Sequence, residues 1–205
     1  MSMMLPKIEV FSASFKERIT ELLKSEKLAL DVLGVEGSER AYINSMIQNS
    51  LDRPVIIVTS DNKQAKSFIE DFKFFLKEKD NYVSFFPSHN ILPFKNLSYH
   101  SETTANRVKL LYKMVMGENP PILVTTIDAV LQKLMPQSEL SNFAEIVMVN
   151  ESLDSDDFVS KLIAGGYVKT ILVEEPGDFS VRGGIIDVYS PQYEEPIRIE
   201  LFGDM

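Results

Sequence analysis

The sequence predicts an α/β protein in which a parallel-sheet domain, residues 1–135, is followed by a small α+β domain, residues 136–205. Three observations support this division. Short apolar runs alternate with helical patterns up to about residue 135, which is typical of a parallel sheet with crossover helices. After residue 140 a single helical pattern stands among strand patterns. The charge changes there too, because residues 141–205 carry 4 Lys and Arg against 13 Asp and Glu, whereas residues 1–140 carry 17 of each.

The first half of the chain contains the alternating elements. We expect strands at residues 28–33, 54–59, 82–86 and 121–126. We expect helices at residues 15–23, 42–51, 61–76, 107–115 and 128–134. Asp61 and Asp128 are suited to cap the helices that they precede. The run at 54–59 is almost continuously apolar, which predicts a strand covered on both faces.

The second half is expected to form a helix packed on strands. Residues 145–149 form an apolar run typical of a strand, and residues 167–173 are expected to be extended. Between them, Asp154 or Ser155 is suited to cap a helix that carries Phe158, Leu162 and Ile163 and ends at Gly165-Gly166.

The stretch Asp178–Tyr189 has the most informative pattern in the chain. Phe179 and Val181 share one face of a strand, and Ser180 and Arg182 share the other. The pair Gly183-Gly184 predicts a bulge or the close approach of another backbone. With the alternating run 197–202, this stretch predicts antiparallel strands whose apolar side packs on the helix at 155–163.

Composition excludes several classes of function. The chain has no cysteine, so disulfides and thiolate chemistry are absent. A net charge of −9 argues against general nucleic-acid binding, which gains affinity by neutralising phosphates. No apolar run is long enough to cross a bilayer and no secretion signal is recognised, so a cytoplasmic location is expected. His89 and His100 lack neighbours at metal-ligand spacing, so no metal site is expected.

The turn after the first expected strand resembles a phosphate-binding loop that has lost its chemistry. Gly34 and Gly37 are present, but the second glycine of the motif G-x-x-x-x-G-K-[ST] is replaced by Glu39. Arg40 stands at the lysine position, and Ala41 replaces the hydroxyl that binds magnesium. We therefore expect a degenerate P-loop domain of the RecA or helicase type, with no bound cofactor and no catalytic residues.

The hairpin motif resembles the UvrB-like N-terminal module of bacterial transcription-repair coupling factors. The family pattern is acid-Phe-x-Val-Arg-Gly-Gly-Ile-Ile/Leu-Asp, followed by an aromatic, a proline and Arg-Ile-Glu-Leu/Phe-Phe-Gly-Asp. It is present here in Asp178–Tyr189, Pro191 and Arg198–Asp204. Weaker matches run through the first domain. The resemblance implies a fragment of a longer protein, a UvrA-interaction domain at 136–205, and a P-loop lost relative to UvrB.

The resemblance also implies a partner and its contact residues. In this family the domain that carries the hairpin binds UvrA, and the arginine of the Val-Arg-Gly motif lies on the contact surface. By position this implies Arg182, with Lys169 and Phe179 as weaker members. The sequence departs from the family in two places: Val168 follows Tyr167 where a basic residue is frequent, and Ser180 stands where UvrB-type proteins often have arginine.

The expected function is therefore recruitment of UvrA to damage-stalled RNA polymerase in nucleotide excision repair. The resemblance implies that RNA polymerase, double-stranded DNA, ATP and magnesium are bound only by other parts of the parent protein, an ATP-dependent DNA translocase. It also implies that the parent keeps the UvrA surface covered when free. Two alternatives stay open at this point. The chain could be a UvrB-like nucleotide hydrolase that uses the Gly34–Arg40 loop, or a free-standing adaptor with a different partner.

Overall fold

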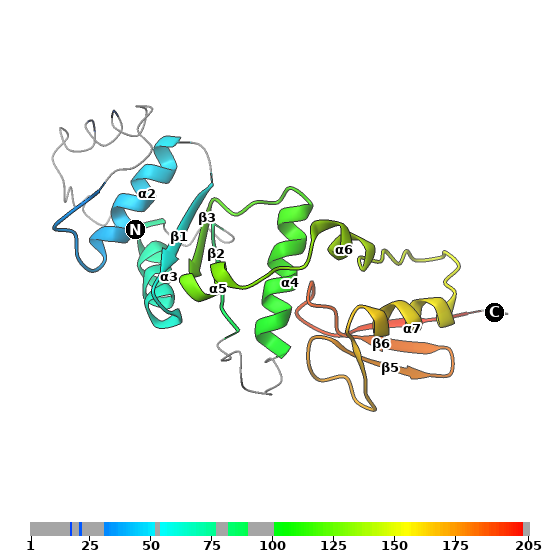
Figure 1. The fold of residues 1–205 in the computed structure, drawn as a ribbon. Helices are drawn as coiled ribbons and strands as arrows, with labels where there is room; N and C mark the ends of the chain where they lie inside the picture. Colours follow the sequence, from blue (N-terminus) through cyan, green and yellow to red (C-terminus); the bar gives the residue numbers. More distant parts are fainter. Residues whose placement is uncertain are drawn as a thin grey trace, which may run out of the picture.

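The computed structural model of the protein describes residues 31–51, 54–76, 82–89 and 101–202, together with the helical positions 17 and 21. The first part contains α2 (Glu39–Leu51), β1 (Val55–Thr59), α3 (Asn62–Leu76), β2 (Val83–Phe86), α4 (Ser101–Val115), β3 (Ile122–Thr126) and α5 (Ile127–Leu131). The second part contains α6 (Gln137–Asn142), α7 (Ser155–Ala164), β4 (Val168–Lys169), β5 (Asp178–Arg182), β6 (Ile185–Val188) and β7 (Ile197–Glu200). Figure 1 shows both parts, and they confirm a mixed α/β protein.

The first part is organised around a parallel sheet in the order β1-β3-β2. The central strand β3 pairs in parallel with both neighbours, as the alternation of strands and helices predicted. Ile122 and Val124 of β3 are fully buried, and they share a core cluster with Phe72 of α3 and Ala41 of α2. Burial of this cluster fixes α3 against one face of the sheet and α2 against α3.

The expectation that β1 is covered on both faces is wrong. Ile57 packs against the core cluster, but its neighbours Ile56 and Val58 are exposed. Successive strand side chains point to opposite faces, so α3 covers only the side that Ile57 occupies. A continuous apolar run cannot distinguish a strand buried on both sides from one that is buried on one side.

The helix ends follow local chemistry that is largely readable from sequence. Asp61 caps α3 as predicted, since its carboxylate accepts a hydrogen bond of 2.8 Å from the Gln64 N–H. Gly117 follows α4 with a φ of +84°, a conformation that glycine adopts without strain. The predicted cap of α5 is wrong: Thr126, rather than Asp128, accepts from the Ala129 N–H at 3.2 Å. α5 also ends at Leu131 instead of residue 134.

The N-terminal elements are only partly described. The helix expected at 15–23 lies outside the described residues except for positions 17 and 21, which are helical. Of the strand expected at 28–33, residues 28–30 lie outside the described part, and residues 31–33 are not in a strand. The glycine turn that follows is therefore joined to α2 without a preceding strand in the described residues.

The second part is built on a sheet in the order β4-β5-β6-β7, which we call the hairpin sheet. β5, β6 and β7 are antiparallel, whereas β4 is parallel to β5. Arg182 pairs with Ile185, so Gly183 and Gly184 form a two-residue turn between β5 and β6. Gly183 has a φ of +59°, as the first residue of such a turn requires. A Cβ at Gly184 would lie 3.2 Å from the Leu201 carbonyl oxygen, which confirms the expected close approach of another backbone.

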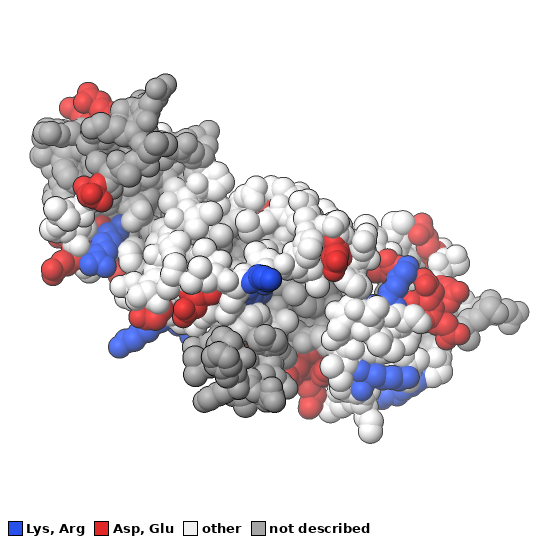
Figure 2. Space-filling view, in the orientation of Figure 1, with Lys and Arg blue, Asp and Glu red and all other residues white. Residues whose placement is uncertain are grey.

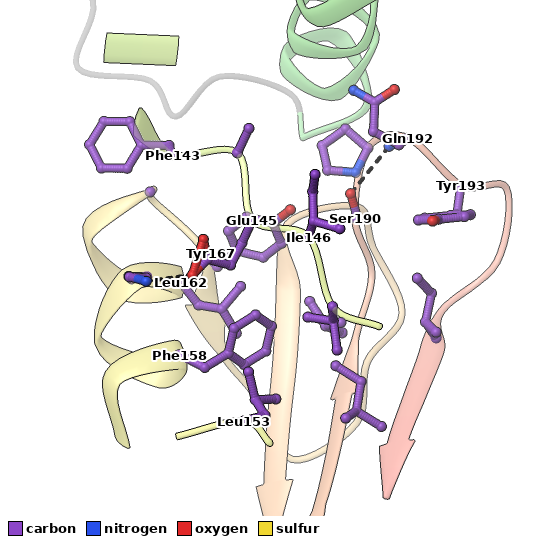
Figure 3. A pocket seen from close by; sticks show the side chains of 18 of the residues that line it. Phe143, Glu145, Ile146, Leu153, Phe158, Leu162, Tyr167, Ser190, Gln192 and Tyr193 are labelled. Atoms are coloured by element: carbon purple, nitrogen blue, oxygen red, sulfur yellow. Dashed lines mark hydrogen bonds and ion pairs between the residues drawn. The ribbon is translucent and has the colours of Figure 1, made fainter. Parts of the chain in front are cut away.

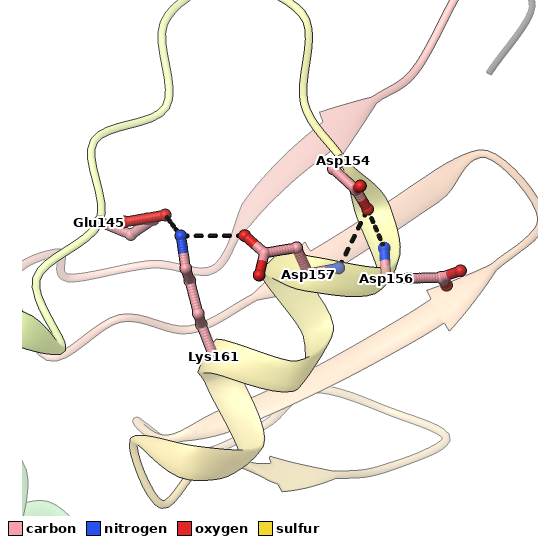
Figure 4. Close-up of polar contacts among 5 residues, drawn as sticks. All are labelled: Glu145, Asp154, Asp156, Asp157 and Lys161. Carbon is pink, nitrogen blue, oxygen red and sulfur yellow. Dashed lines mark hydrogen bonds and ion pairs between the residues drawn. The ribbon is translucent and has the colours of Figure 1, made fainter.

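Helix α7 covers one face of the hairpin sheet, as predicted. Phe158 and Leu162 of α7 form a core cluster with Phe179, Ile186 and Val188 of the strands, and Figure 3 shows the two α7 side chains directed toward the sheet. The Asp154 carboxylate caps the helix by accepting from the Asp156 and Asp157 N–H groups, each at 3.0 Å (Figure 4).

Two expected extended segments differ from the structure. Residues 145–149 are not a strand, although Ile146, Val147, Met148 and Val149 favour one, and all four side chains are exposed. A strand forms only by pairing, and no described strand pairs with this run. Instead Glu145 forms an ion pair with Lys161 of α7. Within 167–173 only Val168 and Lys169 belong to a strand.

Replacing Phe179 with alanine should destabilise the second part strongly. Phe179 has no exposed surface, so its removal leaves a cavity under α7 and should cost about 3–5 kcal/mol of unfolding free energy. Urea unfolding followed by far-UV circular dichroism measures the loss. The matched control is Phe74→Ala on α3, where the ring is 72% exposed and the cost should stay below about 1 kcal/mol. Equal losses in the two variants would contradict the assignment of Phe179 to the core.

Candidate functional site

Arg182 lies at the end of β5, next to the turn into β6. Strand alternation directs its side chain away from the face that Phe179 buries under α7. The side chain is exposed, and one of its Nη atoms donates a hydrogen bond to the Ile171 carbonyl oxygen. This bond links β5 to the segment that follows β4. The other donors of the guanidinium fork can still reach a carboxylate on a second protein.

Lys169 lies on the edge strand β4 and is exposed. In the parallel pairing it is level with Phe179, three residues before Arg182 on the neighbouring strand. Because a strand rises by about 3.3 Å per residue, the two basic residues are separated by roughly 10 Å along the strand direction. Paired residues point to the same face of a sheet, so Lys169 is directed to the Phe179 face and Arg182 to the opposite face. Both residues border the β4 edge of the hairpin sheet.

Phe179 does not belong to this exposed surface, which corrects the expectation that it contributes to partner binding. Its relative exposure is 0%, and its ring packs in the core cluster with Phe158. The same alternation that exposes Arg182 buries Phe179. Ser180 is also almost fully buried, so the outer face of β5 is less open than its alternating pattern predicted.

Charge distinguishes Arg182 and Lys169 from the other two basic residues after residue 140. Lys161 forms ion pairs with Glu145 and Asp157, the latter at 3.0 Å, and Figure 4 shows both contacts. Arg198 donates to both carboxylate oxygens of Asp187, at 2.7 and 3.0 Å. Arg182 bonds instead to a backbone carbonyl, and Lys169 forms no ion pair in the described part of the chain. Figure 2 shows basic residues on the surface of this second part, beside a strongly acidic neighbourhood.

Exposed apolar residues lie directly beside these two basic residues, and the sequence analysis did not single them out. Val168, Ile171 and Leu172 all have exposed side chains. We call these three residues, with Lys169 and Arg182, the β4-edge surface. The run Ile171-Leu172-Val173 was the available signal, but an apolar run in an expected extended segment is more often buried than exposed.

The glycine loop before α2 has a different character. Gly34 and Gly37 have φ values of +74° and +56°, so both adopt the left-handed conformation that glycine favours. Arg40 donates from Nε to the Val35 carbonyl oxygen at 3.1 Å. Glu39 is the first residue of α2, and Ala41 is fully buried in the core cluster of the parallel sheet.

The described residues contain no group of three or more His, Asp or Glu side chains that could hold a metal ion. Burial, together with the positive charge of Arg107, lowers the pKa of His89 below its ordinary value of 6.5. Among the helices in the described ranges, none is long and apolar enough to cross a membrane.

A groove of about 2060 Å³ lies between α7, residues 143–151 and the β6–β7 side of the sheet (Figure 3), and it is lined mainly by apolar side chains such as Ile146 and Tyr193.

Comparison with known proteins identifies the segment that carries the β4-edge surface. Residues 146–205 match the UvrB interaction domain. The match includes α7 and all four strands of the hairpin sheet, so Lys169 and Arg182 both lie inside it.

The whole chain resembles transcription-repair coupling factors. It is 29% identical over 194 residues to the transcription-repair-coupling factor of Myxococcus xanthus and 30% identical over 194 residues to that of Bacillus subtilis, with 93% of this chain covered in each case. It is also 25% identical over 198 residues to the UvrABC system protein B of Thermosipho africanus, with 92% of this chain and 30% of the relative covered. The chain spans 16% of the length of the two coupling factors. These findings confirm the resemblance that the hairpin motif indicated.

The ion pair between Asp187 and Arg198 should make the hairpin sheet sensitive to acid. The hydrogen bonds from Arg198 lower the pKa of the Asp187 carboxyl below its usual 3.8. A carboxyl with a lower pKa in the folded state stabilises the fold above its unfolded pKa, and this contribution is lost as the pH falls through the folded-state pKa. Asp187→Asn should therefore lower the urea midpoint at pH 7, and its difference from wild type should shrink below pH 3.8.

The control for this experiment is Glu195→Gln, which removes an exposed carboxylate from the loop between β6 and β7. Its midpoint should follow that of the wild type from pH 7 downward. A difference between Asp187→Asn and wild type that stays constant with pH would show that ionisation of Asp187 is not the cause.

Proposed function

We propose that this chain is the UvrB-like part of a transcription-repair coupling factor and that it recruits UvrA in nucleotide excision repair. It acts by binding rather than by catalysis. The observation that carries the proposal is the exposed Arg182 at the end of β5, inside the segment that matches the UvrB interaction domain. In an acidic region, an exposed guanidinium that is not neutralised by a bidentate carboxylate favours contact with an acidic surface on a partner.

The division into two domains supports this function. A domain at residues 1–135 contains the parallel sheet and acts as a scaffold, and a domain at 136–205 contains the hairpin sheet and presents Arg182 and Lys169. The core clusters of the two sheets share no residue, which is expected of units that each bury their own apolar face.

The first domain is a degenerate P-loop domain that no longer binds nucleotide. Three features of the Gly34–Ala41 loop support this. Ala41 lies in the core, so the position of the magnesium-binding hydroxyl holds a buried methyl group. The Arg40 guanidinium is bonded to the Val35 carbonyl. Glu39 adds negative charge at the N-terminus of α2, where a phosphate would have to lie. The residues present do not fit ATP and magnesium.

Other activities belong to parts of the coupling factor beyond this region. We propose that ATP-driven translocation on double-stranded DNA and contact with RNA polymerase are carried by the rest of the protein, since this chain spans only 16% of the coupling factors it resembles.

One observation favours a second candidate function. The similarity to a UvrABC system protein B covers 92% of this chain, so a UvrB-like nucleotide hydrolase is the competing assignment. That function requires the Gly34–Ala41 loop to bind ATP, which separates the two candidates experimentally.

Arg182→Ala should weaken binding of UvrA from the same organism by about tenfold or more, because a central arginine is a frequent hot spot of protein interfaces. Isothermal titration of the full chain with purified UvrA measures the change. The matched control is Arg198→Ala, which removes an arginine of the same sheet that is paired with Asp187, and it should leave the affinity within about threefold.

Absence of binding by the wild-type chain would overturn the proposed function. Undiminished binding by Arg182→Ala would overturn the assignment of Arg182 to the interface. Far-UV circular dichroism of each variant verifies that the sheet is retained.

Magnesium and ATP should leave the thermal midpoint of the chain unchanged. A ligand present at 100 times its dissociation constant would stabilise the folded protein by about 2.7 kcal/mol, so even micromolar affinity would be visible with millimolar ATP. Saturable ATP binding that disappears in Arg40→Ala would instead favour the nucleotide hydrolase.

A further inference from the structure

We propose that Ile171 and Leu172 are apolar anchors of the UvrA-binding surface and that Arg182 positions them. This inference rests on the proposed function and adds two contact residues and a second role for the arginine. Ile171 and Leu172 follow the short edge strand β4 and belong to no strand themselves.

The exposure of these two side chains is the first observation. Ile171 is 90% exposed and Leu172 is 62% exposed, and they are consecutive residues. Val168, the first residue of β4, adds further exposed apolar surface. Single exposed apolar residues are common on protein surfaces, but a contiguous cluster beside charged groups is typical of a binding site.

The hydrogen bond from Arg182 is the second observation. Its guanidinium binds the carbonyl oxygen of Ile171 itself, and the Thr170 N–H donates to the Phe179 carbonyl at 2.8 Å. The backbone that carries the two apolar side chains is therefore attached to β5 on either side of the Thr170–Ile171 peptide. Attachment before binding reduces the conformational entropy that association would otherwise remove.

The chemistry of this surface indicates which partner it suits. Lys169 and Arg182 place two positive charges near the apolar pair. Residues 141–205 as a whole carry 13 acidic and 4 basic residues. The complementary surface is an apolar depression with acidic groups at its rim. Because the β4-edge surface lies wholly inside the residues that match the UvrB interaction domain, we assign this complementary surface to UvrA.

The test measures binding of UvrA from the same organism by the full chain carrying Ile171→Ser, Leu172→Ser or both. Each single variant should weaken the affinity by about tenfold, as expected for an apolar anchor in a desolvated contact. The matched control is Val149→Ser, since Val149 is also 90% exposed and lies in the same matched segment but on the groove side of α7. Its affinity should equal that of the wild type.

The possible outcomes separate the two proposals. Failure of the wild-type chain to bind UvrA would overturn the proposed function and this inference with it. Binding by the wild type that is unchanged in the Ile171→Ser, Leu172→Ser double variant would overturn only the anchors. An equal loss in Val149→Ser would also overturn them, because it would show that any exposed apolar residue has the same effect.

A double-mutant cycle tests the positioning role of Arg182. If the arginine acts partly through Ile171, the combined Arg182→Ala, Ile171→Ser variant should lose less affinity than the product of the two single losses. If the loss of affinity in the double variant equals the product of the two single losses, Arg182 and Ile171 act independently. That result would contradict the positioning role of Arg182. Hydrogen exchange provides a second readout: Arg182→Ala should speed exchange of the amides at 170–173 while those of β6 keep the wild-type rate.

Discussion

The burial of Phe179 beneath α7 determines how the rest of the hairpin sheet is arranged. Phe179 packs with Phe158 and Ile186, so one face of β5 is committed to the core. Alternation then directs Arg182 to the opposite face, and the two-residue turn at Gly183-Gly184 returns the chain as β6 at a fixed register. A shift of one residue in that register would bury the guanidinium and expose the ring, at a large cost in free energy.

Polar contacts with β5 order the backbone that carries the exposed apolar residues. The bond between Arg182 and the Ile171 carbonyl connects a rigid strand to a segment that has little secondary structure of its own. This connection links packing to recognition, because the core fixes β5, β5 fixes Arg182, and Arg182 holds the exposed apolar residues. The parallel sheet contributes nothing to this surface directly, which agrees with a scaffold role for the first part of the chain.

Electrostatics explains why only some basic residues of the second part are available to contact a partner. The chain has a net charge of −9, and the acidic excess lies entirely after residue 140. Most cations in such a region are neutralised by neighbours, as Lys161 and Arg198 are. An exposed ion pair contributes little to stability and also occupies the guanidinium or ammonium group. Arg182 and Lys169 form no such ion pair among the described residues, although the charge of Arg182 helps to lower the pKa of Asp187. Both border the β4 edge of the sheet.

Local signals in the sequence predicted the elements whose formation depends on neighbouring residues: the parallel strands, the caps at Asp61 and Asp154, and the antiparallel strands around Gly183-Gly184. They also placed Arg182 on the face of β5 opposite the apolar one. Alternation alone does not determine exposure, because Ser180 on that same face is buried. The tertiary structure alone decided the rest. Residues 145–149 have strand chemistry, but no described strand pairs with them. Ile171 is exposed because β4 ends before it. The end of β4 is set by its pairing with β5, and no local sequence pattern encodes that pairing.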